Sequence, residues 1–138
     1  MSETIQRFKS VFNELNASNL DRLPEIYSAD VIFRDPVHAL NGLPELRAYY
    51  QRLYDGVVSC RFMFHDEIIE QQRAVLVWTM EFEHARFCRG RMSSLNGVSH
   101  LKFDERVHFH HDYFDMGAFI YERVPGLGAV IRAIKRRL

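Results

Sequence analysis

The chain has 138 residues, of which 47% are hydrophobic and 26% are charged, and its 18 Lys and Arg balance its 18 Asp and Glu. That length fits one domain, residues 1–138, which buries roughly two thirds of the surface that the unfolded chain exposes. Balanced charge argues against a dedicated nucleic-acid-binding protein, because no overall field attracts a polyanion. No stretch has the apolar length of a secretory signal or a membrane span, so we expect a cytoplasmic protein with Cys60 and Cys88 as reduced thiols.

The first third of the chain reads as helix, helix, strand and helix. Apolar residues recur at helical spacing from Ile5 to Leu15, and residues 16–19 then predict a stop and the cap of a short second helix that reaches Tyr27. Residues 31–33 form a short strand-like run that ends at Asp35 and Pro36. Residues 42–45 begin a further helix that extends to about Tyr54.

After Tyr54 the apolar period changes from that of a helix to two. Alternating segments near 59–70, 74–88, 92–104 and 105–114 predict a meander of long antiparallel strands. A short helix is expected over 116–123, and a basic amphipathic helix follows from Gly126. We interpret the last helix as packing on the domain, with a membrane-surface role as the minor alternative. Helices followed by a long curved sheet indicate an α+β fold.

Alternation along a strand shows which side chains share a face. Trp78, Met80 and Phe82 share one, which we assign to the interior because it is the aromatic one. In the last strand, His108, His110, Asp112 and Phe114 are expected to share a face. Polar and apolar residues occur on both sides of that strand, so alternation alone does not decide which side is inside.

Two carboxylates, Asp35 and Asp112, stand at the ends of strand-like runs. At the mouth of an apolar pocket such a group can carry a proton near neutral pH, because desolvation raises its pKa. Asp35 can equally cap the turn before Pro36, and both interpretations stay open. Asp115 is better explained as a helix N-cap, which leaves Asp112 as the stronger pocket candidate of that pair. A metal site from His108, His110 and Asp112 ranks far below these readings, and we expect no metal.

The order of these elements, with Phe33-Arg34-Asp35-Pro36, then Gly42 and a tyrosine-rich helix, then four long strands, resembles the cone-shaped fold of nuclear transport factor 2, ketosteroid isomerases and SnoaL-like polyketide cyclases. The resemblance covers nearly the whole chain. It implies a cone-shaped α+β barrel in which a curved antiparallel sheet packs on the N-terminal helices, with a C-terminal helix added. Enzymes, binding modules and dimerisation domains all use this fold.

The resemblance also implies roles for single residues. Asp35 falls where the isomerases keep their proton-shuttling carboxylate, and Asp112 or Asp115 where the cyclases keep their acid/base. His110, on the same face as Asp112, can either bind a ligand oxygen or be oriented by the carboxylate. Val11 and Ser99 stand where the isomerases have two oxyanion donors, so that oxyanion hole is not implied. The implied ligand-binding residues are Tyr27, Phe33, Tyr50, Trp78, Met80, Phe82, Ser99, Leu101 and Phe114.

Two classes of function follow. The first is a cofactor-independent proton-transfer enzyme of the isomerase or cyclase type, acting on a small hydrophobic carbonyl compound through Asp35, Asp112 and His110. Epoxide hydrolysis by an Asp, Arg, Asp set ranks below it, because Arg34 alternates away from Asp35. The second is a non-catalytic module that binds a hydrophobic ligand or dimerises. Expected partners are a small hydrophobic molecule and a second copy, with neither nucleic acid nor a membrane surface.

Overall fold

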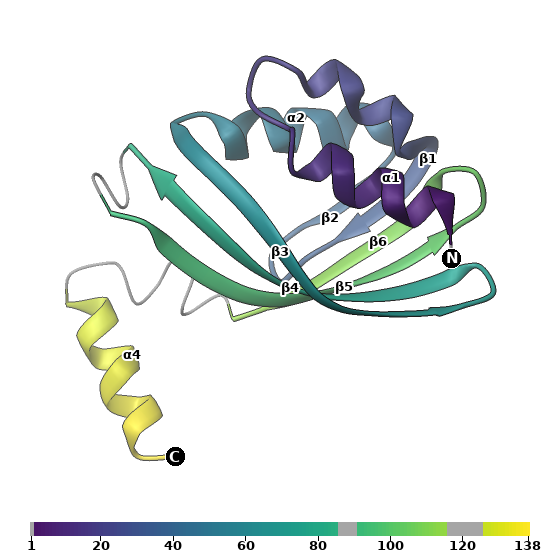
Figure 1. Cartoon of the computed structure of the whole chain (residues 1–138). Helices are drawn as coiled ribbons and strands as arrows, with labels where there is room; N and C mark the ends of the chain where they lie inside the picture. Colours follow the sequence, from purple (N-terminus) through teal and green to yellow (C-terminus); the bar gives the residue numbers. More distant parts are fainter. Residues whose placement is uncertain (1, 86–90, 116–125) are drawn as a thin grey trace.

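The computed structural model describes residues 2–85, 91–115 and 126–138. Its first half contains two helices, a 3-10 helix and two strands, and its second half a meander of long strands and a last helix (Figure 1). In chain order the elements are α1 (Glu3–Phe12), η1 (Leu20–Glu25), β1 (Tyr27–Arg34), β2 (Ala39–Asn41), α2 (Leu43–Tyr54), β3 (Val57–Glu70), β4 (Arg73–His84), β5 (Ser93–Phe103), β6 (Val107–Phe114) and α4 (Leu127–Arg136).

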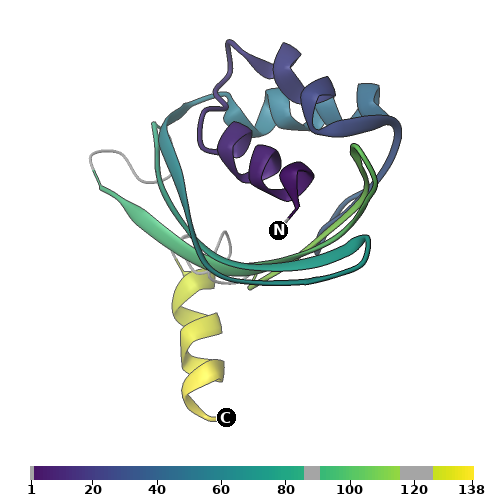
Figure 2. The same ribbon diagram turned by 45° about the vertical axis from the view of Figure 1, so that its right-hand side comes forward.

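The strands form one curved sheet in the order β2-β1-β6-β5-β4-β3, and α1, η1 and α2 cover its concave side (Figures 1 and 2). Strands β3 to β6 pair antiparallel, as predicted. The α+β cone is therefore confirmed, although the sheet is mixed, because β1 pairs in parallel with β6, and it curls without closing into a barrel. Parallel pairing brings the carboxyl ends of β1 and β6 to one end of the sheet.

The N-terminal helices form for local reasons that the sequence shows. The Ser2 side chain caps α1 by accepting a hydrogen bond from the Ile5 N–H, and α1 buries an apolar stripe. The predicted second helix is a 3-10 helix that contains Pro24, a residue without a backbone N–H. Tyr27 lies in β1, which is longer than predicted, and β2 was not predicted.

The interior holds the aromatic face of the sheet. Trp78 and Phe82 are buried and Met80 is half-buried, which confirms the predicted orientation of β4. The predicted face of β6 is wrong at His108. Between the pairs Lys102–Phe109 and Phe103–Val107, β6 has one extra residue, His108, which is exposed while Val107 is buried. This bulge removes His108 from the face that carries His110, Asp112 and Phe114.

Gly97 is required by the packing of Trp78, its partner across β4 and β5. A Cβ atom at Gly97 would lie 2.3 Å from Cη2 of the indole. We expect Gly97→Ala to lower the free energy of unfolding by about 1–3 kcal/mol, because the indole must move in a packed core. Urea denaturation followed by Trp78 fluorescence measures this loss. Ser94→Ala, at an exposed position of β5, is the control; equal stability of the two variants would show that the core accommodates the methyl group.

Helix α4 forms where predicted, but the packing interpretation is wrong. The helix stands off from the sheet (Figures 1 and 2), and Leu127, Val130, Ile134 and Leu138 are exposed. A hydrogen bond of 2.6 Å from Lys135 Nζ to Asp115 Oδ2 links it to the residue after β6. The helix predicted over 116–123 and Cys88 lie outside the described residues. Within the described ranges, no helix is both long and apolar enough to cross a membrane.

Candidate active site around Asp112

Asp112 lies in a hydrogen-bonded network on the inner face of the sheet. Its Oδ1 accepts a hydrogen bond from Ser99 Oγ at 2.5 Å and lies 2.6 Å from His110 Nε2. The register of β5 and β6 places Ser99 opposite Asp112, and His110 precedes Asp112 by two residues on the same face. The His110 side chain is 2% exposed and that of Asp112 is 18% exposed. One oxygen of Asp112 is thus fixed by residues of two strands.

The network continues through three aromatic residues. Tyr27 Oη lies 2.6 Å from His110 Nδ1 and 3.0 Å from Tyr50 Oη, and Trp78 Nε1 donates to Ser99 Oγ at 2.9 Å. Burial raises the pKa of Tyr27 and of Tyr50 well above the ordinary value, so both hydroxyls are neutral donors near neutral pH. When Tyr27 donates to Nδ1, the His110 proton resides on Nε2 and points to Asp112. Each side chain of this network then has a hydrogen-bond partner.

The second oxygen of Asp112 is available. Within the described residues Oδ2 accepts no hydrogen bond, and none of the buried side-chain N and O atoms there lacks a partner, so Oδ2 is not fully buried. A carboxylate that is held through one oxygen and accessible at the other can take a proton from a bound molecule and return it. Asp112 therefore has the geometry of a positioned acid/base.

Asp35 has both oxygens engaged. Its Oδ1 accepts from the backbone N–H groups of Val37 at 2.9 Å and His38 at 2.8 Å and lies 2.9 Å from His38 Nδ1, while Oδ2 accepts from Tyr49 Oη at 2.9 Å. The side chain is 2% exposed. This is the geometry of the turn-capping interpretation. The backbone contacts follow a local Asp-turn signal, whereas nothing in the sequence indicated Tyr49.

The two carboxylates nevertheless lie at the same end of the sheet. The parallel register pairs Phe33 with His110 and Arg34 with His111, so Asp35 follows β1 beside the part of β6 that carries Asp112. The pKa of Tyr49 is raised mainly by burial, and both carboxylates raise it further. Tyr49 therefore lies within the electrostatic reach of both. Arg34 is bound elsewhere, donating to the carbonyl oxygens of Phe33 and Leu40.

Most of the predicted ligand-binding residues are buried inside the domain: Tyr27, Phe33, Tyr50, Trp78, Phe82, Ser99 and Leu101. Met80 and Phe114 are half-buried and pack with Phe82 and Leu95 into a small apolar cluster. Phe114 follows Asp112 by two residues on the same face, so this cluster borders the accessible carboxylate. Cys60 packs there too, and burial raises the pKa of its thiol to about 12, which keeps it protonated.

Among the described residues, neither an oxyanion hole nor a metal centre is found around Asp112. Val11 is a buried core residue, and the hydroxyls of Ser99 and Tyr27 are engaged with Asp112 and His110. Among the residues that the structure describes, no group of three or more His, Cys, Asp or Glu could hold a metal ion.

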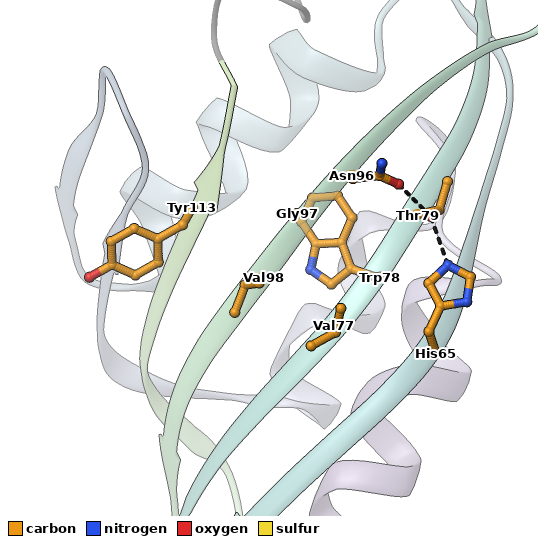
Figure 3. A pocket seen from close by; sticks show the side chains of 8 residues that line it. All are labelled: His65, Val77, Trp78, Thr79, Asn96, Gly97, Val98 and Tyr113. Atoms are coloured by element: carbon orange, nitrogen blue, oxygen red, sulfur yellow. Dashed lines mark hydrogen bonds between the residues drawn. The ribbon is translucent and has the colours of Figure 1, made fainter.

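A hollow of about 530 Å³ lies on the opposite, outer face of the sheet (Figure 3). Val77, Thr79, Asn96, Val98 and Tyr113 line it from positions that alternate with the inward ones. Figure 3 also shows a short chain of hydrogen bonds there, in which Thr79 Oγ1 lies 2.7 Å from His65 Nε2 and donates to Asn96 Oδ1 at 2.6 Å. This hollow is distinct from the apolar pocket predicted for the inside of the cone.

Comparisons with known proteins agree on the fold. No curated protein matches the chain. An NTF2-like protein of unknown function from Burkholderia pseudomallei is 20% identical, with a TM-score of 0.74 over 87% of this chain and 96% of that one. A candidate SnoaL-like polyketide cyclase from Shewanella putrefaciens is 20% identical, with a TM-score of 0.72 over 86% and 94%. A limonene-epoxide-hydrolase-like epoxide hydrolase from M. tuberculosis is 13% identical, with a TM-score of 0.68 over 94% and 93%.

At these identities the solved structures establish the fold alone, and membership of a family comes from the sequence itself. The model of the SnoaL-like domain matches residues 8–131, which is most of the chain. The match includes the second half of α1, all of η1 and α2, the whole sheet and Asp112. The chain belongs to the SnoaL-like domain family.

Proposed function

We propose that this SnoaL-like domain is a cofactor-independent proton-transfer enzyme acting on a small hydrophobic carbonyl compound, with Asp112 as its acid/base. The observation that carries the proposal is that the two carboxylate oxygens of Asp112 have different surroundings. Oδ1 is held by Ser99 and His110, whereas Oδ2 accepts no hydrogen bond within the described residues and is not fully buried. A substrate with an apolar body would pack on the apolar cluster and present an acidic C–H to Oδ2.

The chemical step needs only the groups present. Oδ2 of Asp112 removes a proton from the carbon next to the carbonyl, and the C–H electron pair becomes the C=C bond of an enolate with its charge on oxygen. Where a C=C bond adjoins that carbon, the enolate is conjugated, and return of the proton from Asp112 to the far end of the conjugated system isomerises the substrate. Where the enolate carbon instead attacks a second carbonyl, the new C–C bond closes a ring and the resulting alkoxide takes the proton back from Asp112. His110 supports Asp112 by keeping its Nε2–H directed at Oδ1.

The second candidate is a non-catalytic domain that binds a hydrophobic ligand. The observation that favours it is that the Ser99 and Tyr27 hydroxyls are occupied within the network, which leaves an enolate oxygen without these two donors. Loss of one such donor typically lowers a rate about 10²–10³-fold, so the isomerisation of a simple ketone would be slow.

The proposal includes a cytoplasmic location and a homodimer formed through the outer face of the sheet. Support for the dimer comes from the half-buried Val75, Val77 and Val98 and the exposed Tyr113 on that face. Glu81 and Glu83 share it, which matches the polar rim of a protein interface.

Exchange of carbon-bound hydrogen tests the enzyme against the binding module. Native mass spectrometry with organic extraction first identifies any molecule that co-purifies. The full chain is then incubated in D₂O with ketones of increasing apolar size, and ¹H NMR follows the loss of the signal from protons next to the carbonyl. We expect faster exchange than in buffer for at least one apolar ketone. Binding of the apolar ketones without faster exchange of any of them would favour the non-catalytic function.

A further inference from the structure

Helix α4 presents an apolar face to solvent. Leu127, Val130, Ile131, Ile134 and Leu138 recur at helical spacing, and the side chains of Val130 and Ile134 are each 56% exposed. Gly128 is the one buried residue of this helix. A stripe of aliphatic side chains directed into water is unfavourable, which indicates that something apolar covers it in the functional state.

The rest of the helix is cationic. Residues 126–138 include Arg132, Lys135, Arg136 and Arg137 and no acidic residue. Lys135 is paired with Asp115, whereas Arg136 and Arg137 are exposed at the end of the helix. An apolar stripe flanked by cations is typical of helices that lie in the interface of an anionic membrane.

We propose that α4 binds the surface of a bilayer that contains anionic phospholipids, with its axis in the membrane plane and its aliphatic stripe at the level of the upper acyl chains. Its 10 residues make it far shorter than a membrane span. A membrane also fits better than a second copy of this chain. The outer face of the sheet carries Arg61, Arg73 and Lys102 as well as acidic residues, so it offers no acidic surface to a cationic helix.

Membrane binding through α4 would orient the site around Asp112. The Lys135–Asp115 pair holds the helix beside the end of β6, the strand that carries Asp112. The apolar cluster next to Asp112 would then lie close to the lipid, from which a hydrophobic substrate could enter. This orientation rests on the proposed function, while the binding of α4 to lipid does not.

Vesicle flotation of the full chain tests the proposal. The vesicles contain phosphatidylcholine alone or with about one third phosphatidylglycerol, an anionic lipid. We expect the chain to float with the anionic vesicles at low ionic strength and to be released by salt. Arg136→Gln with Arg137→Gln should lower the partition coefficient about 25-fold, since each cation near an anionic surface contributes on the order of fivefold. Val130→Gln with Ile134→Gln should lower it at least tenfold, on the order expected for the loss of two aliphatic anchors.

Val58→Gln with Ile68→Gln is the matched control, because these β3 side chains are 61% and 60% exposed. Absence of flotation in the wild type, or an equal loss in this control, would overturn the proposal. A wild type that stays in solution as a dimer, and becomes monomeric by light scattering only in the α4 variants, would show that a second copy covers the stripe. Ketone exchange in solution separates the two proposals, because the α4 variants should exchange ketone protons as the wild type does. A wild type that floats with the vesicles but exchanges no ketone protons would count against the proposed enzyme activity and not against membrane binding.

Discussion

Replacing Asp112 by Asn is expected to lower ketone exchange about 10²–10⁴-fold, the usual contribution of a positioned acid/base. The amide oxygen can still accept the hydrogen bonds that Ser99 and His110 direct at Oδ1, so the network and the fold should persist. The amide nitrogen would occupy the position of Oδ2 and cannot accept a proton. The measurement is the exchange rate at saturating ketone, together with the urea midpoint to show that stability is retained.

Two further variants test whether the lower exchange rate results from the loss of the positioned Asp112 carboxylate. Asp66→Asn removes an exposed carboxylate on β3 and should leave the exchange rate unchanged. Ser99→Ala removes one of the two donors to Oδ1, which should lower the rate by about tenfold through looser positioning of the carboxylate. Full exchange in Asp112→Asn would remove Asp112 from the mechanism and leave the binding module as the explanation.

The fold and several members of the network could be predicted from the sequence, because alternation and turn signals are local. Trp78, His110 and Asp112 were assigned to candidate pocket faces, and the structure joins all three in one chain of hydrogen bonds. The connection itself was not predictable. Tyr27 and His110 are 83 residues apart, and only the parallel pairing of β1 with β6 brings them together.

Other features depend on contacts that no local pattern encodes. The bulge at His108 is visible only in the register of β5 against β6. The bond from Tyr49 to Asp35 needs the placement of α2 beside the end of β1. The outward position of α4 also escaped prediction, since an amphipathic pattern shows that a helix has an apolar face but not what that face contacts.

Asp35 and Asp112 show how the same residue type acquires different roles at one end of a sheet. Asp35 uses both oxygens to close its turn and to hold Tyr49. Asp112 uses one oxygen for the network and keeps the other accessible. The carboxylate that best matches the isomerase position is therefore the less suitable of the two for proton transfer, because its lone pairs are already engaged.

Asp35→Ala is accordingly expected to lower the free energy of unfolding by about 2–4 kcal/mol. The substitution leaves two backbone N–H groups of the turn, the His38 ring and the largely buried Tyr49 hydroxyl without their acceptor, and hydrogen bonds to a charged group contribute about 1.5–3 kcal/mol each before partial replacement by water. Asp35→Asn should cost less, because its amide oxygen can still accept from the turn. Urea denaturation measures both losses.

A control variant and the exchange rate of Asp35→Asn distinguish a structural role of Asp35 from a catalytic one. Asp30→Ala, at an exposed position of β1, the strand that Asp35 follows, should change stability by less than about 0.5 kcal/mol. Per folded molecule, Asp35→Asn should exchange ketone protons within a few fold of the wild type, since Oδ2 of Asp112 is untouched. The opposite pattern, a stable Asp35→Asn variant without exchange, would identify Asp35 as the acid/base. Asp112 would then be a structural partner of Ser99 and His110 and not the acid/base.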